Sequence, residues 1–464
     1  MSLLVPLVMF GWIPVVLSLF VRYPARRAVI ISFVVAWLFL PQAGYPLPGL
    51  PDYTKMSATC YGILLATFIY DAGRFRAFKP GWLDLPMEIW CLSPMASSIA
   101  NDLGAYDGFS SSMEQVVTWG LPYFLGRLYL GNLVGLKQLA IAIFAGGLAY
   151  VPLCLLESRI SPQLHRLVYG FHASLDFSQT MRMGGYRPTV FMVHGLAVGA
   201  WMMAATLIGM WLWYAGVLKS FWGKPIKLLA STLLFTFINC RSTGAYLLLV
   251  IGLGILFGGK KLRTTLPLLV LIAFITGYLY LGVSGAITPE RRAQINVALT
   301  KTLNAERAQS LDFRLANEEI LGEKARESPM FGWGGWGRAR VYDDYGKDIS
   351  VTDSLWIIAF GNQGVVGVIS LFSSILLPSL CFCFSRYRPH TWKHPDIAPA
   401  ACLTVVSTLF ALDCVLNAMV NPVFTLACGG IAGLVMHPQV VKPTQTRRLP
   451  KKMAPSKRLT TLQH

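Results

Sequence analysis

The chain has 464 residues, of which 54% are hydrophobic and 13% charged, and its formal net charge is +18. This composition excludes an ordinary soluble domain, because the apolar residues form runs close to the roughly 20 residues that cross a bilayer. A transmembrane β-barrel is also excluded, since the runs show no alternation of apolar and polar residues. The basic residues lie mostly between apolar runs, which is typical of membrane-protein loops and not of nucleic-acid binding. We therefore expect an all-α polytopic membrane protein without a nucleic-acid partner.

The apolar runs predict about 12–13 transmembrane helices. The first run, Leu3–Val21, has no charge ahead of it and no small-residue cleavage site after it, so we expect no cleavable signal peptide. The expected spans are residues 3–21, 28–41, 54–70, 86–100, 113–131, 137–156, 190–215, 226–240, 243–258, 265–285, 355–384, 398–416 and 419–436.

Clusters of lysine and arginine in the short loops set the expected orientation. If the spans alternate, these clusters all fall on one side, which the positive-inside rule makes the cytoplasmic side. The C-terminus is then cytoplasmic and the N-terminus external, although one merged span among the first six would reverse the N-terminus. The six expected parts are a transmembrane scaffold (1–156), an external segment (157–189), core transmembrane helices (190–285), one long external loop containing short helices (286–352), C-terminal transmembrane helices (353–436) and a basic, disordered tail (437–464).

The long polar insert is the feature around which the other candidates are arranged. Its composition predicts a helix over Arg307–Glu327, which Ser328 and Pro329 end. The glycine-rich run that follows cannot be regular helix, and its glycines allow unusual backbone angles and the close approach of a ligand. Trp333 and Trp336 in this run lie at the membrane interface or stack on a sugar face.

Arginines at membrane depth are the first chemical signal. Arg241 lies between two apolar runs with almost no loop, Arg187 precedes the seventh expected span, and Arg314 lies in the insert helix. A charge there is costly unless it is paired or lines a polar cavity, and the alternative is an arginine that snorkels at a helix end. Arginine clamps phosphate through two hydrogen bonds, so three arginines on one face suggest a pyrophosphate or another multivalent anion. Arg127 faces the cytoplasmic end and is expected to be structural.

Three further residues have both a structural and a functional interpretation. Asp353 precedes an apolar run, where it is either a helix N-cap or a carboxylate that takes a proton from an acceptor hydroxyl. Asp413 lies within an expected span, where it pairs with a buried arginine or relays protons. His194 follows Arg187 by seven residues, about two helical turns, and either shares its face or is a hydrogen-bonded core residue.

Cofactor motifs are absent from the sequence. The nine cysteines fall in or beside expected spans without metal-ligand spacing, so we interpret them as small buried hydrophobic residues. There is no HExxH, CxxC pair, Walker loop, dinucleotide fingerprint or DxD pair, so we expect no metal and no cofactor.

The order of these motifs resembles the superfamily of O-antigen ligases and O-antigen polymerases. The resemblance rests on a TxxNxRSTG-like turn at Thr236–Gly244, Arg314 followed by the glycine pattern of Pro329–Gly337, and a polar motif entering a helix at Asp353–Gly364. It covers about Arg187–Val435. It implies a multi-pass protein of the bacterial inner membrane that transfers glycan from an undecaprenyl-pyrophosphate carrier to an acceptor hydroxyl on a glycan or lipid at the periplasmic face, without metal or nucleotide.

The resemblance also implies roles for individual residues. Arg241 is similar to the superfamily's arginine at a span end and Arg314 to that of its external loop, and both would hold the pyrophosphate, with Arg187 as a third ligand. The ligases carry histidine and asparagine where this chain has Asp353 and Ser354. This departure favours a polymerase of O-antigen or exopolysaccharide repeat units over a ligase of lipid A-core or protein. A transporter or flippase of lipid-linked glycan is the alternative from another class.

Overall fold

The computed structural model describes residues 2–47, 50–174, 180–286 and 305–439. The expected tail therefore lies almost entirely outside the described residues, as does the first part of the long insert. Each expected span falls on a helix of the structure. The matching helices are α1 (Leu4–Arg22), α2 (Ala25–Phe39), α3 (Lys55–Tyr70), α5 (Leu85–Ala100), α6 (Ala105–Gln115) continued through the π-helical turn η1 (Val116–Gly120) into α7 (Leu121–Leu130), α8 (Leu133–Ile160), α10 (Gly195–Tyr214), α11 (Ile226–Asn239), α12 (Thr243–Leu262), α13 (Leu266–Ser284), α16 (Leu355–Phe384), α17 (Ala398–Leu416) and α18 (Pro422–Met436).

The rest of the described secondary structure is short. Three two-stranded antiparallel hairpins join helices, namely β1 (Gly44–Leu47) with β2 (Leu50–Thr54), β3 (Met181–Arg182) with β4 (Gly185–Tyr186), and β5 (Ser220–Phe221) with β6 (Lys224–Pro225). The remaining helices are α4 (Gly73–Ala77), α9 (Leu164–Tyr169), α15 (Ala305–Arg326) and the 3₁₀ turn η3 (Pro389–Thr391).

Seven of the described helices, α1, α8, α10, α12, α13, α16 and α17, are long and apolar enough to cross a membrane. The shorter helices α11 and α18 are also apolar. The prediction of a mostly helical protein with the character of a multi-pass membrane protein is therefore confirmed. The cysteines, all of which lie in the described part of the chain, are free thiols, and all but Cys381 are buried.

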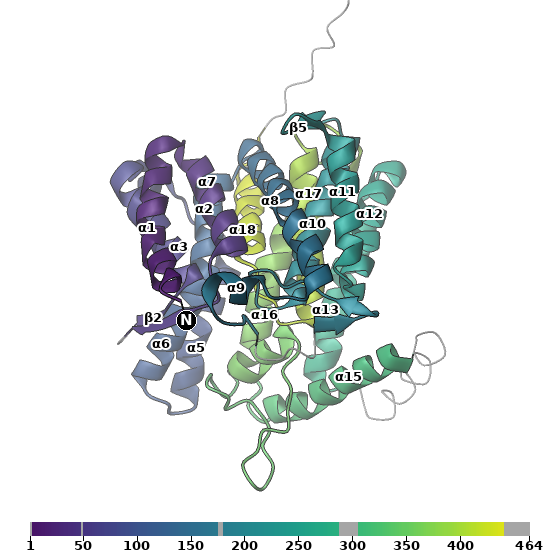
Figure 1. Cartoon of the computed structure of the whole chain (residues 1–464). Helices are drawn as coiled ribbons and strands as arrows, with labels where there is room; N and C mark the ends of the chain where they lie inside the picture. The colour runs from purple at the N-terminus through teal and green to yellow at the C-terminus, as the bar shows by residue number, and fades with distance from the viewer. Residues whose placement is uncertain (1, 48–49, 175–179, 287–304, 440–464) are drawn as a thin grey trace, which may run out of the picture.

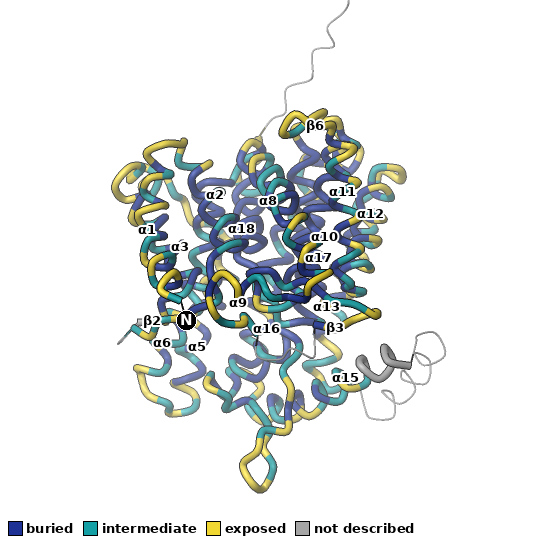
Figure 2. Tube along the Cα trace, in the orientation of Figure 1, coloured by how far each residue is buried: buried dark blue, intermediate teal, exposed yellow. Residues whose placement is uncertain are grey.

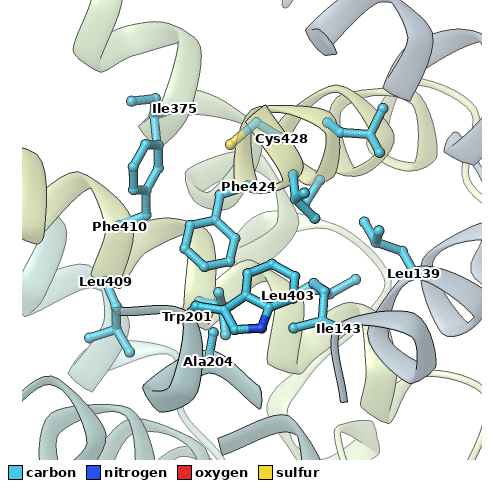
Figure 3. Close-up of a cluster of buried hydrophobic side chains, with 14 of the residues drawn as sticks. Leu139, Ile143, Trp201, Ala204, Ile375, Leu403, Leu409, Phe410, Phe424 and Cys428 are labelled. Carbon is cyan, nitrogen blue, oxygen red and sulfur yellow. The ribbon is translucent and has the colours of Figure 1, made fainter. Parts of the chain in front are cut away.

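The centre of the bundle is formed by α10, α17 and α18 (Figures 1 and 2). In the most apolar stretch of α17, 94% of the residues are buried, and in that of α10 the share is 83%. The corresponding share is 28% in both α1 and α13, which therefore lie at the periphery. Trp201 of α10 stacks on Phe424 of α18 with ring centroids 6.2 Å apart, and Phe410 of α17 meets Phe424 edge-on at 5.4 Å (Figure 3). Interlocked aromatic rings hold the three central helices in one register.

Glycines let α7 and α18 pack backbone against backbone. A Cβ at Gly126 would overlap the carbonyl oxygen of Leu426, and a Cβ at Gly429 would overlap that of Tyr123. Small residues at such a contact are typical of helix pairs within membranes, where close approach replaces the hydrophobic effect as the source of stability.

The two ends of the bundle differ. One end carries α15 and residues 327–354, and we call it the insert face; the other carries the β5–β6 hairpin and the turn between α1 and α2 (Figure 1). The helix predicted over Arg307–Glu327 is confirmed as α15, which ends before Ser328 and Pro329 as expected, because a residue before proline avoids helical backbone angles.

A break in α16 receives the glycine-rich run of the insert. The helix is interrupted at Gly364, whose φ of 65° and ψ of −157° are not helical. The freed carbonyl of Gly361 accepts a hydrogen bond from the Trp333 amide at 2.8 Å. A Cβ at Gly332 would lie 2.5 Å from the backbone of Asn362. The close approach that we expected for a ligand is therefore made by the backbone of α16, and the glycines are needed for that packing.

Candidate active site

Arg241 occupies the tight turn between α11 and α12. Its φ of 51° is left-handed, which reverses the chain within three residues between the two helices. The side chain extends over the β3–β4 hairpin, where Nη1 donates to the carbonyl oxygen of Arg182 at 3.4 Å. A Cβ at Gly185 would overlap the guanidinium group, so the hairpin needs glycine at this position to admit the arginine.

Arg187 lies between β4 and α10 in the chain and is hydrogen-bonded to Arg241. It is only 7% exposed, and its alkyl chain packs against Gly195 at the start of α10. Its Nη2 donates to the carbonyl oxygen of Arg241 at 3.4 Å. Its Nε is buried without a hydrogen-bond partner. Among the described residues, Arg187 and Arg241 have no carboxylate within ion-pair distance.

The electrostatic surroundings of Arg187 oppose its charge. Burial, together with the positive charges of Arg182 and Arg314, lowers the pKa of its guanidinium to about 10. Arg314 of the insert helix is therefore among the charges that act on Arg187. An anion placed here would supply both the missing hydrogen-bond acceptor and the missing negative charge.

Arg314 connects the insert to the end of α17. Its Nη1 donates to the carbonyl oxygen of Leu416 at 3.0 Å, which satisfies a free carbonyl at the end of that helix. Its Nε lies 3.8 Å from Oδ2 of Asp353, and the two side chains are 28% and 40% exposed. The insert helix, the end of α17 and the segment before α16 therefore meet at one partly exposed ion pair.

Asp353 is not the helix N-cap that its position allowed. The N-cap of α16 is Ser354, which makes no side-chain capping hydrogen bond, and its hydroxyl instead donates to Oε1 of Glu318 at 2.8 Å. The carboxylate of Asp353 is thus left facing Arg314 and solvent. The structural interpretation of Asp353 as a cap is wrong, and the carboxylate is available for chemistry.

Glu318 holds the Asp353 segment in place, a role that the sequence did not reveal. Besides the Ser354 hydroxyl, its carboxylate accepts hydrogen bonds from Tyr278 Oη at 2.6 Å and from Trp356 Nε1 at 3.0 Å. Burial raises the pKa of Glu318, while these hydrogen bonds act in the opposite direction. Its spacing of four residues from Arg314 places both on one helix face, and that spacing is the signal that could have identified it.

Asp413 lies beside this site without joining the ion pair. It is 8% exposed in the last turn of α17, and Oδ1 accepts a hydrogen bond from Asn417 Nδ2 at 2.7 Å. The pairing with a buried arginine is not seen within the described residues, where the nearby charge of Arg314 acts on Asp413 without an ion pair.

His194 is the N-cap of α10, and its Nδ1 accepts a hydrogen bond from the Leu196 amide at 3.1 Å. The segment from Arg187 to His194 is not helical, and Val190 within it has a φ of 51°. The expectation that His194 shares a helical face with Arg187 two turns earlier is therefore wrong, because that spacing applies only to a continuous helix.

The two tryptophans of the insert have different surroundings. Trp333 donates from Nε1 to the carbonyl oxygen of Lys324 at 2.7 Å, and the ammonium of the same lysine lies 3.8 Å from its ring centroid. Trp336 is 76% exposed with a φ of 61°. Trp333 is thus a packing residue of the insert, and Trp336 is the tryptophan with an accessible ring.

The predicted site residues gather on the insert face from separate parts of the chain. Arg187 and Arg241 form one group, Arg314 and Asp353 the other, and the charge of Arg314 acts on Arg187 across the space between them. Sequence reasoning did not include Arg182, whose charge also reaches Arg187. Such an arrangement can bind a multivalent anion beside a carboxylate that accepts a proton.

No protein-family model and no curated protein sequence matches this chain.

Proposed function

We propose that the chain is a metal-independent membrane glycosyltransferase that transfers glycan from an undecaprenyl-pyrophosphate carrier to an acceptor hydroxyl at the insert face. The observation that carries the proposal is Arg187, a buried arginine without a carboxylate partner among the described residues, held against the backbone of Arg241. A buried charge in this state is costly unless a bound anion compensates it. A pyrophosphate supplies that compensation.

The proposed reaction uses Asp353 as the base. The acceptor hydroxyl gives its proton to the Asp353 carboxylate and attacks the anomeric carbon of the lipid-linked glycan. A new glycosidic bond forms as the bond to the pyrophosphate oxygen breaks. The negative charge that grows on the departing lipid pyrophosphate is stabilised by Arg241, Arg187 and Arg314, whose positions are fixed before the reaction begins.

Polymerisation of O-antigen or exopolysaccharide repeat units is the preferred form of this activity. The carboxylate of Asp353, which stands where the resembling ligases carry histidine, supports a polymerase over a ligase. The lysine and arginine clusters between the apolar helices support a bacterial inner-membrane location with the insert face in the periplasm. On this proposal the partners are the lipid-linked oligosaccharide donor, a glycan or lipid acceptor, and the membrane.

Replacement of Arg241 tests the proposal against a matched control at the other end of α12. Arg263, which ends that helix, has a φ of 53°, so alanine introduces comparable backbone strain at both positions. With purified full-length protein and lipid-linked oligosaccharide, Arg241→Ala should lower product formation roughly 10²–10³-fold, whereas Arg263→Ala should not. Full product formation by Arg241→Ala or Arg314→Ala at normal expression would show that the assignment is wrong.

The products separate the competing functions. Longer carrier-linked glycan on a gel indicates a polymerase, and transfer of intact glycan to a lipid or protein acceptor indicates a ligase. Movement of the donor across a vesicle membrane without new glycosidic bonds indicates a transporter or flippase.

A further inference from the structure

A basic cavity lies at the end of the bundle opposite to the insert face. It has a volume of about 620 Å³ and opens beside the turn between α1 and α2, next to the end of α3 (Figure 1). Its charged and aromatic lining comprises Phe20, Tyr23, Arg26, Arg27, Tyr70, Asp71 and Arg74. Three guanidinium groups therefore surround one space with a single carboxylate among them.

The three arginines are held in place by contacts that leave most of their charge uncompensated. Arg26 donates from Nε to a backbone carbonyl of α7 at 3.0 Å, and Arg27 lies over the Tyr23 ring, 5.0 Å from its centroid. Arg74 pairs with Asp71 at 3.2 Å. Among the described residues, Arg26 and Arg27 have no ion-pair partner. The helix α2 also begins here without an acidic residue in its first turn, so its amide end adds to the positive potential.

An exposed apolar surface continues from the cavity along α1 and α3, which pack against each other. Val21 at the end of α1 is 68% exposed, and Phe68 and Ile69 at the end of α3 are 70% and 53% exposed. A basic cavity directly beside exposed apolar side chains matches a molecule with an anionic group and hydrocarbon chains. A soluble phosphate would use the cavity and leave the apolar flank without a role.

We propose that this cavity binds the phosphate head group of an anionic membrane lipid, whose chains lie along the exposed flank of α1 and α3. The guanidinium groups of Arg26, Arg27 and Arg74 hold the phosphate oxygens through charge-assisted hydrogen bonds. The site shares no residue with the candidate active site, so it is independent of the proposed glycosyltransferase function.

The test measures binding of a short-chain phosphatidylglycerol to delipidated full-length protein in non-ionic detergent, with phosphatidylcholine and inorganic phosphate in parallel. The cavity variant combines Arg26→Gln, Arg27→Gln and Arg74→Gln. The control variant combines Lys219→Gln, Lys224→Gln and Lys227→Gln, which remove the same charge from the same end of the bundle. The cavity variant should bind phosphatidylglycerol roughly tenfold more weakly or worse, and the control should bind like the wild type.

Arg27→Gln alone provides a second variant, because Arg27 is exposed and, among the described residues, its guanidinium group contacts the Tyr23 ring without an ion pair. It should weaken phosphatidylglycerol binding about fivefold and decides the question if the triple variant does not fold. Unchanged binding by the folded arginine variants, or an equal loss in the lysine control, overturns the proposal. Arginine-dependent binding of inorganic phosphate as tight as that of the lipid also overturns it, since the site would then recognise a soluble anion.

Discussion

Arg127 and Arg187 are two buried arginines of one chain with opposite surroundings. The Arg127 side chain is 4% exposed and meets Asp84 through two contacts, Nε to Oδ1 at 2.6 Å and Nη2 to Oδ2 at 3.0 Å. It also donates to the carbonyl of Lys79 at 2.9 Å. The guanidinium group of Arg187 makes one hydrogen bond among the described residues, of 3.4 Å to the carbonyl of Arg241; its Nε has no hydrogen-bond partner, and like charges lie nearby.

The difference separates a charge that is compensated within the fold from one that is not. Arg127 is compensated within the protein and joins α7 to the segment before α5, as expected for a structural residue. Arg187 is compensated by nothing in the described part of the chain. A buried charge in that state lowers the stability of the folded protein, and strain of this kind collects at functional sites.

The largest effect is expected when the ion pair of Arg127 and Asp84 is broken. Asp84→Ala leaves Arg127 buried and unpaired, which should lower the free energy of unfolding by about 3–5 kcal/mol. The exposed pair of Arg74 and Asp71 is the control, with side chains 39% and 30% exposed, and Asp71→Ala should cost about 0–1 kcal/mol. Chemical unfolding of the purified protein in detergent measures both, and similar losses in the two variants would contradict the contrast.

The next prediction concerns a variant that lacks the uncompensated charge of Arg187. Arg187→Met removes the buried charge and leaves only the Arg241 carbonyl without its 3.4 Å hydrogen bond, so the free energy of unfolding should stay the same or rise. Glycan transfer should fall roughly 10²–10³-fold, because one ligand of the leaving group is lost. Added pyrophosphate should raise the unfolding temperature of the wild type and not of the variant. A variant that loses stability as Asp84→Ala does would place Arg187 among the structural residues.

A smaller effect is expected from Glu318. Its carboxylate is buried, as is the guanidinium group of Arg187, but it accepts hydrogen bonds. Glu318→Gln replaces a carboxylate oxygen by an amide donor that cannot accept hydrogen bonds, which should lower the free energy of unfolding by about 1–3 kcal/mol near neutral pH. Glycan transfer should fall with it, because the Asp353 segment loses its anchor. Equal stability and activity of the wild type and the variant would show that Glu318 does not anchor the Asp353 segment.

The pH dependence of Glu318 gives a separate measurement. Burial raises the pKa of this carboxyl above the ordinary 4.5, so the folded protein binds its proton more tightly than the unfolded chain. This contribution to stability is fully present below pH 4.5 and is lost as the pH rises through the folded-state pKa. Unfolding of wild type and Glu318→Gln across this window should show the decline in the wild type only.

The smallest effects distinguish the two tryptophans of the insert. Trp333→Ala removes the hydrogen bond to Lys324 and the contact with its ammonium group, which should lower the free energy of unfolding by about 1–2 kcal/mol. Trp336→Ala should change it by less than about 0.5 kcal/mol, because the side chain is exposed. If Trp336 stacks on the glycan, its variant should raise the KM for the lipid-linked donor at unchanged stability.

The helices were predictable from the sequence because their signal is local. A run of apolar residues long enough to cross a bilayer has few stable alternatives to a helix, so each expected span falls on one. The end of α15 at Ser328 and Pro329 follows from proline chemistry in the same way. The arginines of the candidate site could be proposed from the sequence, since an arginine beside an apolar run is conspicuous wherever it lies.

Two features of the insert depend on contacts between distant segments and could not be predicted from the local sequence. The polar neighbours of Asp353 suggested a helix N-cap. Only the packing of α15 shows that Glu318 accepts a hydrogen bond from Ser354 and that the Asp353 carboxylate faces Arg314. The glycine-rich run suggested the close approach of a ligand. Only the break in α16 shows that the backbone of that helix packs closely against Gly332.

The sequence by itself determined that this is a helical membrane-type protein with arginines at its helix ends and a polar insert. The expected topology placed Arg127 at the cytoplasmic end and Arg187 at the external end, but it could not show which of the two charges is compensated. Asp84 lies 43 positions before Arg127 in the chain, and the packing of α5 against α6 and η1, which lead into α7, brings the two together. No corresponding carboxylate reaches Arg187 in the described residues. The tertiary structure decided which charge is compensated, since compensation depends on distances that chain order does not contain.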